Sequence, residues 1–497
     1  MTIPSREQWE SLYQSLRIEG RAFVDGAYRD SVSGDHFECV SPVDGRVLAA
    51  VASCDAADAE LAVAAARRTF DSGVWAHQAP AQRKRVLIAF ADLLLANAQE
   101  LALLETLDMG KPIADALGID IPAAANSIRW SAEAIDKVYD EVAPTPHDQL
   151  GLVTREPIGV VAAIVPWNFP LMMACWKLGP ALATGNSIIL KPSEKSPLTA
   201  IRVAQLALQA GIPAGVFNVL PGYGHTVGKA LALHMDVDTL VFTGSTRIAK
   251  QLMVYAGESN MKRVWLEAGG KSPNIVFADA PDLNAAAEAA AAAIAFNQGE
   301  VCIAGSRLLV ERSIKERFLS MVVEALKAWK PGHALDPETR VGALVDSTQL
   351  DTVLGYVEAG KADGATLVTG GERVLEDTCG VYVQPAIFDG VTNAMRIARE
   401  EIFGPVLSVI TFDTAEEAIA IANDSPFGLA AAVWTADISR AHRSARALRA
   451  GSVWINQYDG GDMTAPFGGF KQSGNGRDKS LHAFDKYTEL KATWIKL

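Results

Sequence analysis

The stretch GVVAAIVPWNFP, residues 159–170, opens a series of four β-rich runs that decides the fold. Each run is ended by proline or glycine, and the segments between the runs have the apolar spacing of helices. Strand and helix in alternation predict right-handed βαβ units and a parallel sheet, with ligands beyond the carboxyl ends of the strands. The other three runs are SIILKPSE (187–194), GVFNVLPG (215–222) and DTLVFTGS (238–245).

The regions on either side of this series also carry structure signals. Residues 20–54 predict small strands, and residues 81–112 predict a long helical run that stops at GKP. A second α/β region is predicted from residue 271 onwards. The tail 487–497 alternates as an extended strand, which would pair with the hairpin predicted at 145–157 or with another subunit.

Composition and charge indicate a large core and an acidic surface. The 497 residues are 49% hydrophobic and 21% charged, which suits two or three domains. A formal net charge of -13 argues against nucleic acid or an acidic membrane as a partner, because both need clustered basic residues. The five cysteines are scattered without metal-ligand spacing, so neither a disulfide framework nor a metal site is predicted. With no apolar leader or spanning stretch, we expect a cytoplasmic protein.

Two loops at predicted strand ends are candidates for binding a dinucleotide. Ser245 of FTGSTRIAK would face a pyrophosphate at a helix N-terminus, although an ordinary N-cap explains it equally. Lys191 and Glu194 of KPSE would hydrogen-bond a ribose diol, and this carboxylate favours NAD because it repels the 2′-phosphate of NADP. An exposed loop pair is the alternative. The GxGxxxG at 222–228 is one residue off the dinucleotide fingerprint, so a structural turn explains it at least as well.

Two further residues are candidates for chemistry. Glu267 of WLEAGGKSP lies among apolar residues, where a raised pKa would make it a general base; a paired or solvated carboxylate is the alternative. Cys302 lies in FNQGEVCIAGSR (296–307), between an alanine-rich helix and an apolar strand. Its nearest titratable neighbour in sequence is Glu300, so a thiolate would depend on backbone amides or a distant base. An inert, partly buried cysteine is the alternative.

Seven separated motifs, read together, resemble the aldehyde dehydrogenase superfamily in order and spacing over essentially the whole chain. They are PWNFP, KPSE, FTGST, LEAGGKSP, NQGEVCIAGSR, EEIFGPV and PFGGFKQSGNGRD. More narrowly, three longer segments resemble the bacterial γ-glutamyl-γ-aminobutyraldehyde and 4-guanidinobutyraldehyde dehydrogenases of polyamine and arginine breakdown. These segments are IRWSAEAIDKVYDEVA, NMKRVWLEAGGKSPNIVFAD and DGGDMTAPFGGFKQSGNGRDKSLHAFDKYTELK.

The resemblance implies an aldehyde dehydrogenase fold with three parts. A Rossmann-like, parallel-sheet NAD-binding domain would comprise residues 1–140 and 159–270. A second α/β domain, the catalytic one, would comprise 271–477. A small β oligomerisation extension would comprise 141–158 and 478–497, and a homodimer or homotetramer is implied with it.

The resemblance also implies a reaction. Cys302 would attack the aldehyde carbon, and the Asn168 side-chain amide and the Cys302 backbone N–H would hold the oxyanion. After hydride transfer to the nicotinamide, a water activated by Glu267 would hydrolyse the resulting thioester. Lys177 would lie near Asn168 and a proton path.

The family motifs assign ligand contacts by position. The cofactor is NAD, with NADP as the alternative, and its contacts would be Trp167, Lys191, Glu194, Gly228, Gly244, Ser245, Gln349, Glu401 and Phe403. The aldehyde would be contacted by Phe169, Met173 and Trp176, with Asp120, Asp459 and Asp462 near the mouth. These carboxylates would match a guanidinium or ammonium tail, and solvated loop residues are the alternative for Asp459 and Asp462.

Two residues depart from the pattern of many relatives. Ala268 stands where many have Leu, and this smaller side chain would loosen the wall beside Glu267. Asp478 stands where many have Glu, and the shorter side chain puts a proton-relay role in doubt.

The expected activity is NAD(P)-dependent oxidation of ω-amino, guanidino or γ-glutamylamino aldehydes to carboxylic acids. A broad-specificity aliphatic aldehyde dehydrogenase is the alternative. An acylating enzyme that releases its product to coenzyme A is disfavoured by Glu267, which would hydrolyse the thioester. A catalytically silent binding relative is disfavoured by the joint presence of Cys302, Glu267 and Asn168.

Overall fold

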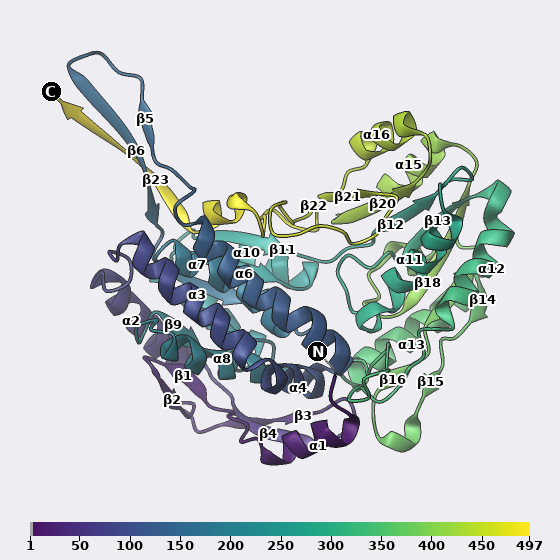
Figure 1. The fold of residues 1–497 in the computed structure, drawn as a ribbon, viewed down its shortest axis with the longest axis horizontal. Coiled ribbons are helices and arrows are strands. Elements are labelled where there is room, and N and C mark those ends of the chain that lie inside the picture. Colours follow the sequence, from purple (N-terminus) through teal and green to yellow (C-terminus); the bar gives the residue numbers. More distant parts are fainter. Residues whose placement is uncertain (1–2) are drawn as a thin grey trace.

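Two seven-stranded sheets dominate the computed structural model, which describes residues 3–497. They lie in two lobes that face each other, each flanked by helices (Figure 1). In the first sheet, strands β11, β10, β7, β8 and β9 are parallel, whereas β1 and β2 extend the sheet in antiparallel pairs. The predicted parallel sheet is confirmed. In spatial order its strands are β11 (Arg263–Glu267), β10 (Thr239–Thr243), β7 (Val160–Ile164), β8 (Ser187–Lys191), β9 (Phe217–Val219), β1 (Ala22–Val24) and β2 (Ala27–Arg29).

The loops that leave the parallel strands meet at one edge of this sheet. Strands β7, β8 and β10 run in the same direction, so the WNFP, KPSE and FTGS loops at their carboxyl ends lie together. The helices after the strands are α7 (Pro170–Ala183), α8 (Leu198–Gln209), α9 (Lys229–Leu233) and α10 (Thr246–Glu258). The helices before β7 are α1 (Arg6–Ser15), α2 (Ala56–Asp71), α3 (Pro80–Ala96), α4 (Ala98–Met109), α5 (Ile113–Asp115) and α6 (Ile121–Ala134).

The helical run predicted over 81–112 is broken in two. Helices α3 and α4 are bent by 69° at Asn97, whose side-chain amide donates to the Leu93 carbonyl at 2.8 Å. Both helices bury apolar side chains in the same core, so the apolar spacing continues across the break and conceals it. Within residues 3–497, no single helix is long and apolar enough to cross a membrane, and only this bent pair passes by length and composition.

The second sheet starts just after the GG turn that follows β11. All its strand pairs are parallel except β14 with β17. Its strands, in order, are β14 (Thr366–Thr369), β17 (Ala386–Asp389), β18 (Val406–Phe412), β13 (Arg307–Glu311), β12 (Pro273–Val276), β20 (Ala430–Trp434) and β21 (Ser452–Ile455). Its helices are α11 (Leu283–Ala295), α12 (Lys315–Leu326), α13 (Ser347–Ala362), α14 (Arg396–Arg399), α15 (Ala415–Asn423) and α16 (Ile438–Ala447). The domain boundaries given above are kept as a proposal.

A three-stranded arm projects from the first lobe and carries the C-terminus (Figure 1). Strand β23 (Thr488–Lys496) pairs antiparallel with β6 (Gln149–Pro157), which also pairs with β5 (Glu141–Ala143). The predicted pairing of the tail with the hairpin is therefore confirmed. Three small two-stranded sheets complete the described part of the chain: β3 (His36–Val40) with β4 (Val47–Ala52), β15 (Arg373–Val374) with β16 (Tyr382–Val383), and β19 (Phe427–Gly428) with β22 (Phe470–Lys471).

Candidate active site

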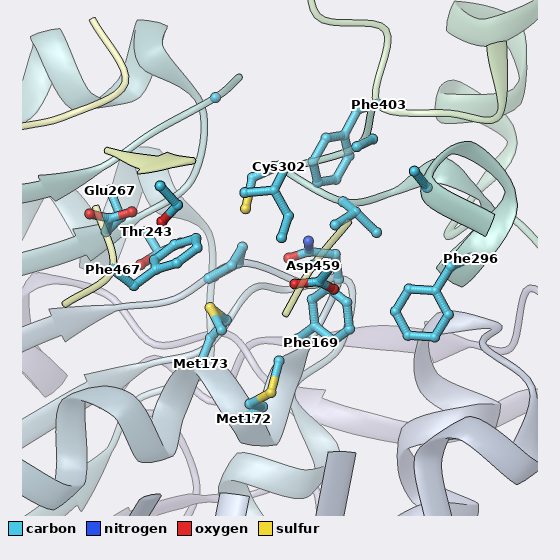
Figure 2. A pocket seen from close by; sticks show the side chains of 18 of the residues that line it. Phe169, Met172, Met173, Thr243, Glu267, Phe296, Cys302, Phe403, Asp459 and Phe467 are labelled. Atoms are coloured by element: carbon cyan, nitrogen blue, oxygen red, sulfur yellow. The ribbon is translucent and has the colours of Figure 1, made fainter. Parts of the chain in front are cut away.

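A cavity of about 750 Å³ is lined by loops of both large sheets. Figure 2 shows side chains from separate parts of the chain around it. The predicted residues that line it are Trp167, Asn168, Phe169, Met173, Trp176, Gly244, Ser245, Glu267, Cys302, Gln349, Glu401, Phe403, Asp459 and Asp462. Those that do not line it are Asp120, Lys177, Lys191, Glu194 and Gly228.

The loop that carries Cys302 has an unusual backbone. Asn297 and Gln298 are buried and have positive φ angles of 47° and 58°. Side-chain-bearing residues rarely adopt this conformation, so the surroundings must hold it. The side-chain oxygens of Gln298 and Glu300 each accept a hydrogen bond at 3.0 Å from backbone N–H groups of the 342–345 segment. The loop is thereby anchored to the segment that precedes α13.

The Asn168 amide lies against the same loop. Its Nδ2 donates to the Glu300 carbonyl oxygen at 2.8 Å, and Asn297 Nδ2 donates to the Asn168 carbonyl at 3.0 Å. These two hydrogen bonds fix the position of the WNFP loop of the first sheet relative to the cysteine loop of the second. Asn168 thus contacts the residue two positions before Cys302, although it is far from Cys302 in sequence. Its amide is placed to donate a hydrogen bond to the oxygen of a carbon atom that the thiol attacks.

The Cys302 thiol faces the cavity (Figure 2). Its pKa is raised by burial and, to a lesser extent, by the carboxyl groups of Glu267 and Glu401. A raised pKa disfavours the thiolate form. A nucleophilic role requires a base that takes its proton.

Glu267 ends strand β11 and presents a buried carboxyl group to the cavity. Its Oε1 has no hydrogen-bond partner among the described residues. Burial raises the pKa of this carboxyl well above its ordinary value; Asp478 raises it further, whereas Lys177 and Lys486 lower it. A raised pKa moves the group towards the range in which a general base works.

Asp478 connects Lys177 to the cavity wall. This carboxylate is fully buried and pairs with the ammonium groups of Lys177, on α7, and Lys486. Burial alone would raise its pKa, yet the two lysines hold the pKa of Asp478 below its ordinary value. Since Asp478 lines the cavity and pairs with Lys177, it connects Lys177 to the cavity.

The loops proposed for the dinucleotide differ in their contact with the cavity. Ser245 is the N-cap of α10, and its Oγ accepts from the Ile248 N–H at 3.4 Å. Ser245 therefore caps α10, as the alternative states, and it also lines the cavity. Lys191, the last residue of β8, and Glu194 form an ion pair of 3.1 Å. Gly228 ends a π-helical turn with ordinary helical backbone angles, φ -62° and ψ -44°.

Glu401 approaches the cavity over the GG turn of LEAGGKSP. Its Oε1 accepts from the Gly270 N–H at 2.9 Å, and a Cβ on Gly269 would lie 2.0 Å from its Oε2. A Cβ on Gly270 would lie 2.3 Å from the Cys302 carbonyl oxygen. The turn therefore needs both glycines for the close approach of these two groups. Burial raises the pKa of Glu401 to about 7.

Gln349 holds the neighbouring wall. Its Nε2 donates to the carbonyl oxygens of Ile402 and Phe403 at 3.1 and 2.7 Å. The Phe403 ring packs edge-on against Trp167, with centroids 5.1 Å apart. Gln349 thereby fixes the position of Phe403, and it also lines the cavity itself.

The far part of the cavity is aromatic with two carboxylates. Trp176 packs edge to face on Phe467, with ring centroids 5.2 Å apart. The pKa of Asp459 is raised because the surrounding wall displaces water, and Lys479 partly offsets this effect. Asp462 accepts from the Thr464 N–H and hydroxyl, and its pKa is lowered by these bonds.

The prediction for Asp120 needs a correction, because its carboxylate does not reach the cavity. It is fully buried and pairs with Lys111, whose Nζ also lies 3.7 Å from Glu105. Lys111 in turn lies 4.2 Å from the Phe169 ring centroid. A buried, paired carboxylate is unavailable to a substrate tail, so Asp120 supports the wall behind Phe169 instead.

Several cavity residues were missed by the sequence reasoning. They are Met172, Phe296, Trp454, Tyr458, Phe467 and Lys479, all of which line the cavity. Three of them had a signal, since Phe296 opens FNQGEVCIAGSR, Phe467 lies inside the motif PFGGF and Lys479 directly follows SGNGRD. The others lie in segments whose approach depends on the tertiary fold.

The chain belongs to the aldehyde dehydrogenase family, which it matches over residues 28–493. It is 56% identical over 489 residues to the NADP/NAD-dependent aldehyde dehydrogenase PuuC of Escherichia coli (strain K12), covering 98% of each chain. An indole-3-acetaldehyde dehydrogenase solved with NAD+ is 78% identical, with a TM-score of 0.99 over 99% of this chain and 100% of that one. The γ-glutamyl-γ-aminobutyraldehyde dehydrogenase of Burkholderia cenocepacia J2315 is 62% identical, with a TM-score of 0.98 and the same coverage. The predicted family, fold and enzyme class, an oxidoreductase acting on aldehydes, are confirmed.

Proposed function

We propose that this enzyme oxidises ω-amino-type aldehydes to carboxylic acids with NAD, through a thioester on Cys302. The observation that carries the proposal is that one cavity is lined by a cysteine, an amide donor and a buried carboxyl group, namely Cys302, Asn168 and Glu267. The guanidino, γ-glutamylamino and amino aldehydes of polyamine and arginine breakdown form the substrate class. The name of the relative from Burkholderia cenocepacia, a γ-glutamyl-γ-aminobutyraldehyde dehydrogenase, supports this choice.

The chain offers groups that fit a dinucleotide. Ser245 and Gly244 present the N-terminus of α10 to the cavity, which suits a pyrophosphate, and the Lys191–Glu194 pair suits a ribose diol. The carboxyl group of Glu401 can exchange its bond to the Gly270 N–H for one from a second ribose. When bound, the nicotinamide supplies the acceptor for hydride. The relative solved with NAD+ and the dual NADP/NAD description of the Escherichia coli relative support this cofactor class.

The residues of the chain divide the chemistry between them. Glu267, with its raised pKa, takes the Cys302 proton directly or through water, and the thiolate adds to the aldehyde carbon. The Asn168 amide and the Cys302 N–H stabilise the oxyanion. After oxidation, Glu267 activates a water that hydrolyses the thioester and regenerates the thiol. The Lys177–Asp478 pair offers a route by which the proton on Glu267 leaves.

Replacing Asn168 with alanine should lower kcat/KM by about 10² to 10³, because one oxyanion donor is lost. Steady-state kinetics with a single aldehyde measures the change. Its Nδ2 also bonds the Glu300 carbonyl, and Asn168→Ala and Asn168→Asp both lose this bond together with the oxyanion donor, so the melting temperature of each variant is measured beside its kinetics to detect a loosened loop. Near-normal kcat/KM in both variants would exclude Asn168 as an oxyanion donor.

Replacing Glu194 with serine should shift cofactor preference towards NADP by about tenfold or more. The substitution removes the charge that repels a 2′-phosphate and leaves Lys191 to attract it. The ratio of kcat/KM for NADP to that for NAD measures the shift, with the exposed Glu324→Ser as the matched control. An unchanged ratio would show that the ribose end binds elsewhere.

A second substrate class is favoured by the aromatic wall. Trp176, Phe467, Trp454 and Tyr458 line the cavity, and the relative at 78% identity is an indole-3-acetaldehyde dehydrogenase. A kinetic panel decides between the classes: guanidino, γ-glutamylamino, amino and plain aliphatic aldehydes of equal length, with indole-3-acetaldehyde. The ω-amino proposal fails if the aliphatic or indole substrate has the highest kcat/KM. Product formation that depends on coenzyme A would favour an acylating enzyme instead.

We also propose a homodimer or homotetramer. The arm supports it, since Leu490, Trp494 and Leu497 of its edge are exposed apolar side chains. The mass of the particle in solution tests the assembly. The cytoplasmic location stays a prediction from composition.

A further inference from the structure

Lys479 is a cation in the aromatic part of the cavity wall. Its Nζ lies 4.7 Å from the centroid of the Trp176 ring and 5.5 Å from that of Phe467. Both rings and Lys479 line the cavity. An ammonium group over ring faces is attracted by their π electrons, so Lys479 occupies a position that would otherwise suit the cationic end of a substrate.

The backbone directs Lys479 to this position. Lys479 and the next residue, Ser480, have positive φ angles of 57° and 52°. Two successive side-chain-bearing residues in this region require support from neighbours. Asp478 and Phe467 exchange backbone hydrogen bonds of 2.7 and 2.8 Å, and the Ser480 N–H donates to the Met463 carbonyl at 2.8 Å. The carboxylate of Asp478 thereby meets Lys177 and Lys486, whereas the ammonium of Lys479 meets the two rings of the cavity wall.

Lys479 is also electrostatically linked to Asp459, which lines the same cavity (Figure 2). Burial raises the pKa of Asp459 and lowers that of Lys479, and each group opposes the shift of the other. The negative charge that was expected to attract a cationic tail is therefore offset by a positive charge within the same wall. Asp462, held by Thr464 at the surface, is the remaining carboxylate of the mouth.

We propose that Lys479 is a specificity-determining residue that sets the charge preference of the cavity. Its ammonium group occupies the ring faces of Trp176 and Phe467 and offsets the negative charge of Asp459. It therefore disfavours binding of cationic aldehydes and favours binding of anionic ones, whereas neutral tails are little affected. The inference rests on the proposed function only in that this cavity receives the aldehyde tail.

The test compares three aldehydes in the full-length enzyme: 4-guanidinobutyraldehyde as the cation, hexanal as the neutral compound and succinic semialdehyde as the anion. Lys479→Met keeps the side-chain length and the backbone requirement but removes the charge. It should raise the guanidino-to-hexanal ratio of kcat/KM by about tenfold and lower the succinic semialdehyde-to-hexanal ratio. Lys479→Arg should keep both ratios, as should the surface control Lys327→Met.

A change of less than about twofold in both ratios would overturn the proposal, because a charge lost beside the tail must separate the substrates. An equal fall for all three aldehydes would also overturn it, since that result indicates a purely structural role. If Lys479→Met does not fold, Lys479→Gln carries the same comparison. Failure of the proposed function is seen separately, as a wild-type enzyme that prefers hexanal or succinic semialdehyde to 4-guanidinobutyraldehyde, or that oxidises none of the three.

Discussion

Replacing Cys302 with alanine should abolish NADH formation from every aldehyde. The thiol is the cavity's nucleophile in the proposed reaction, and no thioester forms without it. Among residues 3–497 the other cysteines cannot substitute, because Cys39, Cys54 and Cys175 are buried elsewhere and Cys379 does not line the cavity. Absorbance at the NADH band, followed with excess enzyme over substrate, measures both the first turnover and the steady state.

Two controls separate lost chemistry from a damaged fold. NAD binding, measured by calorimetry, should be retained in Cys302→Ala, because the groups assigned to the cofactor are untouched. The exposed Cys379→Ala should keep full activity. Measurable turnover in Cys302→Ala above the contamination level would refute the covalent mechanism, since the oxyanion donor and the base would then suffice.

The strands of the first sheet, and the motif-bearing loops at their ends, could be predicted from the sequence. The strand ends at WNFP, KPSE and FTGS were marked by local glycine and proline, and parallel pairing then brings them to one edge. The break at Asn97 could not be predicted, because the apolar pattern of α3 and α4 continues through it into one core. Local composition thus marked chain turns better than it marked a bend between two buried helices.

The candidate site could be predicted where the motif that contains a residue also contains the strand end or loop that positions it. Cys302, Asn168 and Glu267 meet as expected because each lies at a strand end or in an adjoining loop. The roles of the aspartates were harder to predict, because the environment of a carboxylate depends on partners that are far away in sequence or around a turn. The carboxylate of Asp120 forms an ion pair with Lys111. Asp459 is offset by Lys479, whose direction is set by an uncommon backbone conformation.

Replacing Glu267 with glutamine should leave a first turnover and remove the later ones. The variant keeps the size of the side chain but cannot accept the proton of the hydrolytic water, so the thioester accumulates. We expect a burst of about one NADH per subunit, followed by a steady-state rate lowered by about 10² to 10⁴. Rapid-mixing absorbance measures the burst, and the intact mass of acid-quenched protein measures the acyl group on Cys302.

The size and speed of that burst reveal how many proton transfers depend on Glu267. The Cys302 thiol has a raised pKa, so some base must also serve the first attack. A fast burst with acylated protein would assign Glu267 to hydrolysis and the first deprotonation to another group or to water. A slow burst would assign both steps to Glu267, and the acidic limb of the wild-type pH profile would then lie above the ordinary range of a carboxyl group, because burial and Asp478 raise its pKa. Unchanged steady turnover would contradict both assignments, since an unpaired, buried carboxyl group beside the thiol would then have no chemical role.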